Sequence, residues 1–311
     1  MHKLLLNKLE LTFTIQPNGP ILIKSGVESG ADPTLPDMNF VRGLHPTKGT
    51  STIYLPGSSL KGVLRSHAER LVRTVGRDCC DPLGGDACDQ RPVFRARHYE
   101  PDGPTAYREV CTICRMFGHT VLASRVMVPD AYPETPITTL PIRQMVAIDR
   151  RSGGSVNTFT MEVATEGVFT VRVLLSNFER WQVGLLALVL RDLSRGQVGV
   201  GFGKSRGLGR VTLNYTNLAL IYPGRQVLDN ANAVVYGVAE LDQTLRLGLA
   251  EQYGFAPAFW PAEDDINIEH ATLNDKWGQI EVTITGQTQI ECVLESLATD
   301  WARYAGAQHH A

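Results

Sequence analysis

Cysteine is concentrated in one short part of this 311-residue chain. Five of the six cysteines fall between residues 78 and 118, and the last two of these form a Cys-x-x-Cys motif. Four thiolates that converge from a short, irregular segment are the ligand set that tetrahedral zinc takes in structural sites. The sequence therefore predicts a structural zinc site in a loop insertion at 78–118, with the following candidate ligands: Cys79, Cys80, Cys88, Cys111 and Cys114.

Two choices at this site stay open. Five cysteines compete for four places, so Cys79 and Cys80 are not distinguished. His98 or His119 is able to replace one thiolate. A redox Cys-x-x-Cys is the rival interpretation, but it needs a thioredoxin-like strand–helix pattern that is not visible here. Cys292 lies in a strand-like stretch, which predicts a buried thiol of the core.

A second stretch combines glycine with cations. Residues 199–209 hold five glycines, and the nearby cations are Lys204, Arg206 and Arg210. Uncovered backbone amides and nearby cations are what a loop needs in order to follow a phosphate chain. The order of a P-loop is absent, and the stretch follows a helical pattern and enters a strand, so a dinucleotide-binding loop is excluded as well. A turn that needs positive φ would explain the glycines but not the cations.

Asp32 is the third candidate. An Asp before a Pro is most often a turn former, but this one lies in a loop of some two dozen residues, 26–50, without periodicity. Loops of that length in a domain are often functional. A carboxylate there could hold a divalent metal or position a water against a phosphodiester. His67 is the histidine near these motifs, and it is either a general base or a solvated side chain.

The net charge of the chain conceals an uneven distribution of charged residues along the sequence. The whole chain carries a formal charge of -2. Residues 1–228 hold 27 Lys and Arg against 19 Asp and Glu, whereas residues 229–311 hold 3 against 13. Phosphate recognition depends on local basic surface, so the averaged charge does not exclude a nucleic-acid partner. No apolar run approaches the roughly 20 residues of a membrane-spanning helix, and the short apolar stretch near the N-terminus does not resemble a signal peptide, so we expect a cytoplasmic protein without membrane contact.

The elements that must position these groups alternate between strands and helices, which predicts an α+β fold with a mostly antiparallel sheet. An N-terminal hairpin, a basic amphipathic helix that Ser58 or Ser59 caps, and a long hairpin with a basic tip are expected. The expected strands are 9–15, 21–23, 121–128, 143–148, 157–163, 167–175 and 210–214, and the expected helices are 60–75 and 181–193.

Four strings in fixed order resemble one family. They are LPGSSLKGVLR (55–65), CTICRMFG (111–118), ASRV (123–126) and GLGRV (207–211). Together they make residues 5–215 similar to the RAMP superfamily, and more narrowly to the backbone subunit of type III CRISPR effector complexes of the Csm branch and its III-D relatives. The first string is the most specific of the four.

This resemblance implies a ferredoxin-like, RRM-type palm with an antiparallel sheet, built from residues 1–228, with subunits that stack along a CRISPR RNA beside other type III effector subunits. It implies that the hairpin 143–162 is a thumb that wedges between nucleotides of the guide–target RNA duplex. The residues that it places on RNA are Ser58, Ser59, Lys61 and Arg65 in the helix, Arg143, Met145, Val146, Ile148, Arg150 and Arg151 in the thumb, and Lys204 and Arg206 in the glycine-rich loop.

The resemblance also implies catalysis. Asp32 matches an aspartate that, in the family, cleaves target RNA opposite each splayed nucleotide with a divalent metal, magnesium or manganese. The acidic C-terminal extension 229–311 matches nothing in the family pattern. It is expected to bind a neighbouring subunit, to repel stray RNA, or only to extend the sheet; if it marks a terminal or specialised subunit, the protein is a non-catalytic RNA-binding scaffold.

Overall fold

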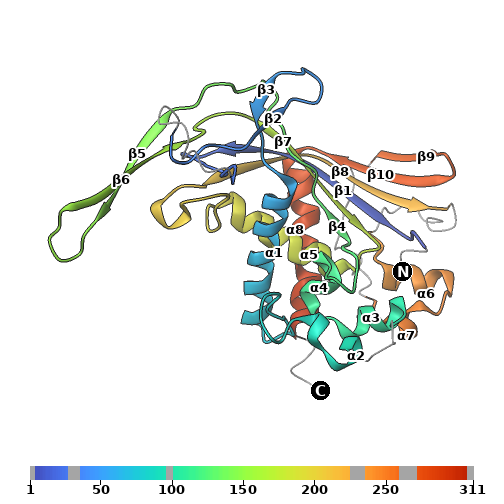
Figure 1. The fold of residues 1–311 in the computed structure, drawn as a ribbon. Helices are drawn as coiled ribbons and strands as arrows, with labels where there is room; N and C mark the ends of the chain where they lie inside the picture. Colours follow the sequence, from blue (N-terminus) through green and yellow to red (C-terminus); the bar gives the residue numbers. More distant parts are fainter. Residues whose placement is uncertain (1–3, 27–35, 96–100, 225–234, 259–271, 307–311) are drawn as a thin grey trace.

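An antiparallel sheet of six strands forms the centre of the computed structural model, which describes residues 4–26, 36–95, 101–224, 235–258 and 272–306. The strand order is β4-β7-β1-β8-β10-β9, and helices α1, α5 and α8 lie against one face (Figure 1). The strands are β1 (Lys8–Pro17), β4 (Val126–Met127), β7 (Phe169–Ser176), β8 (Val211–Pro223), β9 (Thr272–Lys276) and β10 (Gln279–Thr285), and the three helices are α1 (Gly57–Thr74), α5 (Arg180–Ser194) and α8 (Gln287–Gly306).

Strand β1 occupies the middle of the sheet because its sequence alternates with period two. Leu9, Leu11, Phe13 and Ile15 point toward the helices and are at most 2% exposed, whereas the residues between them are half-buried on the other face. The strand pairs antiparallel with β7 on one side and with β8 on the other. The helices thus pack on a continuous apolar floor.

The connections follow the βαββαβ order of ferredoxin-like folds. The chain runs from β1 through α1 to β4 at one edge, returns in β7 beside β1, and passes through α5 to β8 on the far side of β1. The predicted α+β class with antiparallel pairing is confirmed.

Several local predictions were wrong. Residues 21–23 do not return along β1, because β7 and β8 take both of its edges; Ile21 instead forms a bridge with Ala164. The strand expected at 121–128 is reduced to β4. Cys292 lies on helix α8, and its side chain is exposed instead of buried in the core.

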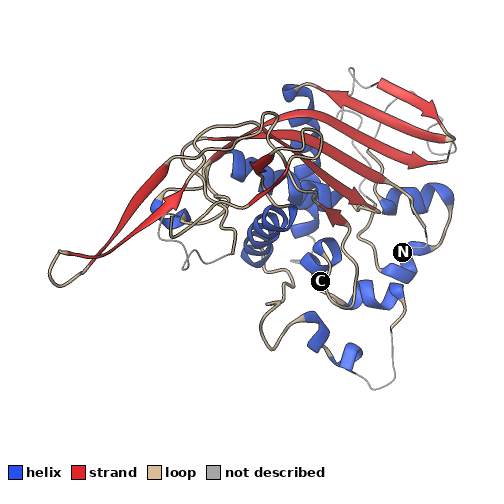
Figure 2. Cartoon of the chain, turned by 45° about the horizontal axis from the view of Figure 1, so that its top comes forward, coloured by secondary structure: helices blue, strands red, loops and turns tan. Residues whose placement is uncertain are grey.

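A two-stranded hairpin extends away from the body (Figures 1 and 2). Its strands are β5 (Ile142–Ile148) and β6 (Ser155–Glu162), which pair antiparallel with an irregularity at Ala147 and Ile148. Asp149 accepts hydrogen bonds from the backbone of Arg151 and Ser152 and so closes the tip. A second, small ribbon is formed by β2 (Arg42–Leu44) and β3 (Ser51–Ile53).

The remaining helices are short, and the described helices include none that is long and apolar enough to cross a membrane. Most of them belong to the cysteine-rich insertion or to the C-terminal part of the chain (Figure 1), and η2 lies in the glycine-rich loop. They are η1 (Cys88–Gln90), α2 (Pro92–Arg95), α3 (Gly103–Glu109), α4 (Thr112–Phe117), η2 (Lys204–Arg206), α6 (Val238–Leu245) and α7 (Leu249–Tyr253).

The acidic C-terminal part extends the same sheet. Strand β10 pairs antiparallel with β8, and β9 with β10. Helix α8 packs beside α5, where the Trp181 ring stacks on Tyr304 with 4.3 Å between centroids. A buried ion pair joins the two helices, with Arg180 Nε 2.7 Å from Asp300 Oδ2. Because both side chains are at most 1% exposed, their desolvation is offset only while the pair is intact.

We therefore expect Asp300→Ala to lower the free energy of unfolding by about 3 to 5 kcal/mol, because it leaves the Arg180 guanidinium buried without its carboxylate. Urea denaturation followed by circular dichroism measures this loss. Glu295→Ala, which removes an exposed carboxylate from the same helix, is the control and is expected to change stability by less than about 0.5 kcal/mol. Equal midpoints for the two variants would contradict a structural role for the pair.

Candidate metal centre and cationic groove

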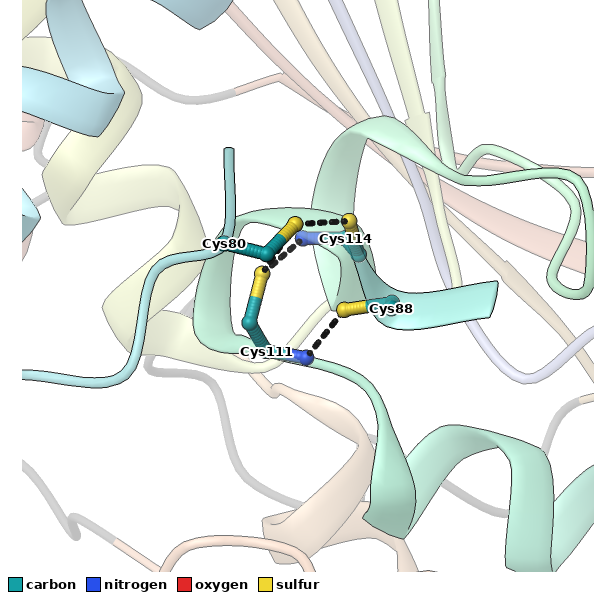
Figure 3. Close-up of side chains that lie close together, drawn as sticks. All are labelled: Cys80, Cys88, Cys111 and Cys114. Carbon is teal, nitrogen blue, oxygen red and sulfur yellow. Dashed lines mark hydrogen bonds between the residues drawn. The ribbon is translucent and has the colours of Figure 1, made fainter. Parts of the chain in front are cut away.

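Four cysteines converge in the 78–118 insertion (Figure 3). Their sulfur atoms all lie within 4.8 Å of one another, and all four residues are buried. Cys80 comes from the segment after α1, Cys88 begins η1, Cys111 caps α4, and Cys114 lies one turn later in that helix. Segments that are distant in sequence are thereby held at one point.

The spacing of the sulfur atoms suits a tetrahedral metal. Cys80 Sγ lies 3.7 Å from Cys114 Sγ and 3.6 Å from Cys111 Sγ. Zinc–sulfur bonds of about 2.3 Å in tetrahedral geometry require sulfur–sulfur distances of about 3.8 Å. The two shortest sulfur–sulfur distances match this requirement and the others are at most 4.8 Å, so the four residues could hold zinc, and with four protein ligands such a site is structural.

The ambiguity between neighbouring cysteines is resolved geometrically. Cys80 belongs to the group, whereas Cys79 is half-buried outside it. Burial raises the pKa of Cys79, and the pKa of Cys88 inside the group is raised as well, so position and not protonation separates Cys79 from the group. His119 is not in the group either, and His98 lies outside the described residues.

The protonation states of the clustered thiols depend on one another. The Cys114 and Cys88 thiols hydrogen-bond to Cys111 and lower its pKa, while the shared proton raises the pKa of Cys114. Four adjacent thiolates repel one another unless a metal compensates their charge. Backbone N–H groups of Cys111 and Cys114 point at Cys88 Sγ and Cys111 Sγ, at 3.2 and 3.4 Å, and such donors stabilise thiolate charge.

Helix α1 contacts this centre through two of the predicted RNA-binding side chains. Arg65 forms an ion pair with Glu69 at 2.9 Å, donates to the Gly118 carbonyl at 3.1 Å and reaches Cys114 Sγ at 3.6 Å. Lys61 Nζ donates to Ser124 Oγ at 2.8 Å. Burial and the nearby Arg65 charge lower the pKa of Lys61. The structure thus places both cations on the side of α1 that faces the cysteine insertion.

The start of α1 also differs from the prediction. Pro56 is the N-cap residue, and neither Ser58 nor Ser59 caps the helix. The Gly57 amide donates to Asp130 Oδ1 at 2.8 Å. A Cβ atom at Gly57 would lie 1.9 Å from the Val128 carbonyl oxygen, so only glycine allows this close approach. Much of the 55–65 motif therefore serves packing between α1 and the segment 124–130.

A groove runs along a different side of α1. It lies between the helix and the glycine-rich loop, and its walls bring together Ser58, Ser59 and Lys204 from the sequence predictions. Val63, Ser66 and Lys204 continue into a neighbouring hollow that Arg70 and Arg210 also line. None of the described residues that line these two hollows is acidic, so the groove is cationic throughout.

The glycine-rich loop is held in place by its backbone. Phe202 N donates to the Leu22 carbonyl at 2.7 Å. Gly201 has φ +71°, and a Cβ there would lie 2.1 Å from the same carbonyl oxygen. Glycine is required because both the conformation and the close approach exclude a side chain. The loop presents the Phe202 ring beside Lys24, whose Nζ lies 5.6 Å from the ring centroid.

The β5–β6 hairpin meets this loop midway along its strands. The guanidinium of Arg206 lies 5.2 Å from the centroid of Phe159, which pairs across the hairpin with Met145. Met145 is half-buried, in contrast to the other hairpin residues singled out in the sequence. Those residues are exposed: Arg143, Val146, Ile148, Arg150 and Arg151.

Asp32 lies outside the described residues. The described residues on either side of its segment are anchored near the groove and the hairpin. Lys24, which lines the groove, bridges to Phe40, and the Asp37 carboxylate accepts from Thr160 N at 2.7 Å on β6.

The sequence prediction did not place Lys24 or Arg70 at the groove, whereas it did count Arg210 among the cations of the glycine-rich loop. A signal for Arg70 was present, since Ser58, Gly62, Ser66 and Arg70 recur at intervals of four along α1 and so share one side of it. Lys24 reaches the groove only through tertiary contacts, which no local spacing indicates.

These features define a mixed α/β protein with antiparallel sheets, a cluster of four cysteines and a cationic groove. In a comparison with known protein families, residues 14–212 match the RAMP superfamily. The match covers more than half of the chain, so the protein belongs to this superfamily, whose members are generally associated with CRISPR-related RNA-binding complexes. No curated protein matches the chain with significant similarity.

Zinc content tests the metal centre with a matched pair of adjacent residues. We expect Cys80→Ser to lose most of the bound zinc and to unfold at lower temperature, because a structural site needs all four ligands. Cys79→Ser should keep about one zinc per chain. Elemental analysis and thermal melts, with and without a chelator, measure both; equal zinc content in the two variants would contradict the assignment.

Proposed function

We propose that this protein is a guide-RNA-binding subunit of a type III CRISPR effector complex. The observation that carries the proposal is the groove between α1 and the glycine-rich loop, where cations and serine hydroxyls meet without a described carboxylate. Such a surface suits the backbone of a single RNA strand, because affinity for phosphates comes from cations and from hydrogen-bond donors. The RAMP membership supports RNA as the partner.

Each part of the groove has a chemical role in this proposal. Lys204 and the Ser58 and Ser59 hydroxyls contact phosphate oxygens. Phe202, beside Lys24, offers a flat ring on which a base stacks. Lys61 and Arg65 contribute indirectly and do not contact the RNA, since their hydrogen bonds to the protein fix α1 against the cysteine centre.

The β5–β6 hairpin serves as the thumb in this proposal. It projects from the body (Figure 2) and carries apolar side chains on its surface, with Ile148 66% and Val156 68% exposed. Apolar side chains of this kind can enter between bases and unstack them. Arg150 and Arg151 at the tip would contact the flanking phosphates, and the contact of Arg206 with Phe159 joins the middle of the hairpin to the glycine-rich loop.

Asp32 is the proposed catalytic residue for cleavage of paired target RNA. Support comes from the family resemblance of its loop and from the anchoring of Lys24 and Asp37 beside the groove and the hairpin. The carboxylate would act together with a magnesium or manganese ion, which lowers the charge on the reacting phosphate. Attack by the adjacent 2′-hydroxyl displaces the 5′-oxygen and leaves a 2′,3′-cyclic phosphate.

A non-catalytic scaffold in the same kind of complex is the second candidate. The excess of acidic residues in 229–311 favours it, because such an addition suits a specialised position with a protein neighbour on one side. The two candidates share guide binding and differ only in cleavage.

Guide binding is tested with Lys204→Ala. We expect about tenfold weaker binding of a fluorescent single-stranded RNA, because one charge-assisted phosphate contact is lost. The slope of log affinity against log salt, measured between about 50 and 200 mM, should fall by about 0.7. Arg108→Ala removes one cation from α3, away from the groove, and should bind like the wild type. Equal slopes for the Lys204 and Arg108 variants would remove this lysine from the interface.

Cleavage is tested in the assembled complex with Asp32→Ala in every copy of the subunit. Loss of target cutting with unchanged guide content is expected, as is a 2′,3′-cyclic phosphate on the wild-type product. Asp37→Ala is the control, because its carboxylate binds Thr160 and the proposal gives it no part in the chemistry. If the Asp32→Ala complex still cut target RNA, the catalytic role of Asp32 would be contradicted and the non-catalytic scaffold would be the remaining candidate.

A further inference from the structure

A chain of four polar side chains leads from the interior to the groove. Arg70 Nη2 lies 3.0 Å from His67 Nδ1, and His67 Nε2 lies 2.8 Å from Asp192 Oδ2. The other carboxylate oxygen of Asp192 accepts from Arg191 Nε and Nη2, at 3.0 and 2.8 Å. His67 and Asp192 are buried, whereas Arg70 is exposed and lines the groove.

The donors and acceptors of this chain fix one tautomer of His67. An arginine guanidinium only donates hydrogen bonds, so His67 Nδ1 must accept from Arg70. The proton of the neutral imidazole then lies on Nε2 and is donated to Asp192. Both ring nitrogens are engaged, which removes His67 from the role of general base. Its place in the structure is to connect a buried carboxylate on α5 with a groove cation on α1.

Cations crowd together where Arg70 enters the groove. Arg70, Lys204 and Arg210 line the same hollow, and none of its described lining residues is acidic. Burial and the Arg70 charge both lower the pKa of Lys204. Positive groups held this close gain from an anion between them, and the flanking Ser66 hydroxyl and glycine-rich backbone supply further hydrogen-bond donors.

We propose that Asp192 and His67 are positioning residues that hold the Arg70 guanidinium in a phosphate subsite, shared with Lys204 and Arg210, for one backbone phosphate of the bound RNA. The subsite rests on the proposed RNA-binding function. It lies one step along the groove from Ser58 and Ser59, because Val63, Ser66 and Lys204 line both hollows. The groove therefore holds at least two successive phosphates.

The Asp192→Asn variant distinguishes a role of Asp192 in positioning Arg70 from a role in filling space between the helices. The variant keeps the shape of the side chain, and the Arg191 donors hold the amide oxygen on their side. The amide NH₂ then faces His67 Nε2, which becomes an acceptor and moves the imidazole proton to Nδ1. A protonated Nδ1 no longer accepts from Arg70, so the guanidinium leaves its place although no groove residue has changed.

Binding of a fluorescent single-stranded RNA to the full chain tests the subsite. Arg70→Ala is expected to weaken binding about tenfold and to lower the salt slope by about 0.7. Asp192→Asn should produce a similar loss, and the double variant should bind no more weakly than Arg70→Ala, since both changes remove one interaction. Arg108→Ala again controls for the lost charge.

Nitrogen NMR of histidine-labelled protein supplies a readout that a packing defect would not move. The His67 signals should report a proton on Nε2 in the wild type and on Nδ1 in Asp192→Asn, at equal thermal stability.

The possible outcomes distinguish failure of the phosphate subsite from failure of the proposed RNA-binding function. Failure of the wild type to bind RNA would overturn the proposed function. Wild-type binding with no effect of Arg70→Ala would overturn the subsite alone. Additive losses in the double variant, or an unchanged His67 tautomer, would overturn the positioning role while leaving Arg70 in the groove.

Discussion

Helix α1 must satisfy three neighbours at once, and this constraint organises the molecule. Its apolar side packs on the floor formed by β1 and β7. Lys61 and Arg65 bind the segment that carries the cysteine centre, and the serines on a third side form one wall of the groove. A shift of the helix to suit one neighbour would disturb the other two, so the metal centre and the groove are mechanically connected without touching each other.

The sequence was most informative where one physical rule decides the outcome. Period-two alternation identified β1, a basic, glycine-rich tip between two strand-like stretches identified the β5–β6 hairpin, and helical spacing identified α1 and α5 within a few residues. Cysteine spacing indicated a cluster of five candidates, and four of them, Cys80, Cys88, Cys111 and Cys114, lie together, but spacing did not separate Cys79 from Cys80. The sequence did not indicate which strands pair with each other. The apolar run at 21–23 has the composition of a strand, yet β1 pairs on both edges with strands that are far away in sequence.

Charge was the least reliable guide to role. Lys61 and Arg65 have the composition of phosphate ligands, but both are held by acceptors from the segment 118–124. Arg70, on the same helix, lines the groove, and its guanidinium contacts the buried His67, which in turn contacts Asp192. Whether a cation meets solvent or protein depends on what the rest of the chain brings alongside, and a list of basic residues does not contain that information.

Helix α8 in the C-terminal part has one side that is fixed by buried contacts and another that is exposed. The inner side of α8 is fixed by Asp300, Trp301 and Tyr304 against α5, while its outer side carries exposed carboxylates and is free to change. Residue 228 is thus a boundary in charge but not in structure. A chain that ended there would leave the Arg180 guanidinium buried without the Asp300 carboxylate. A recombination event that exchanged the C-terminal part would have to retain this aspartate together with the rings of Trp301 and Tyr304.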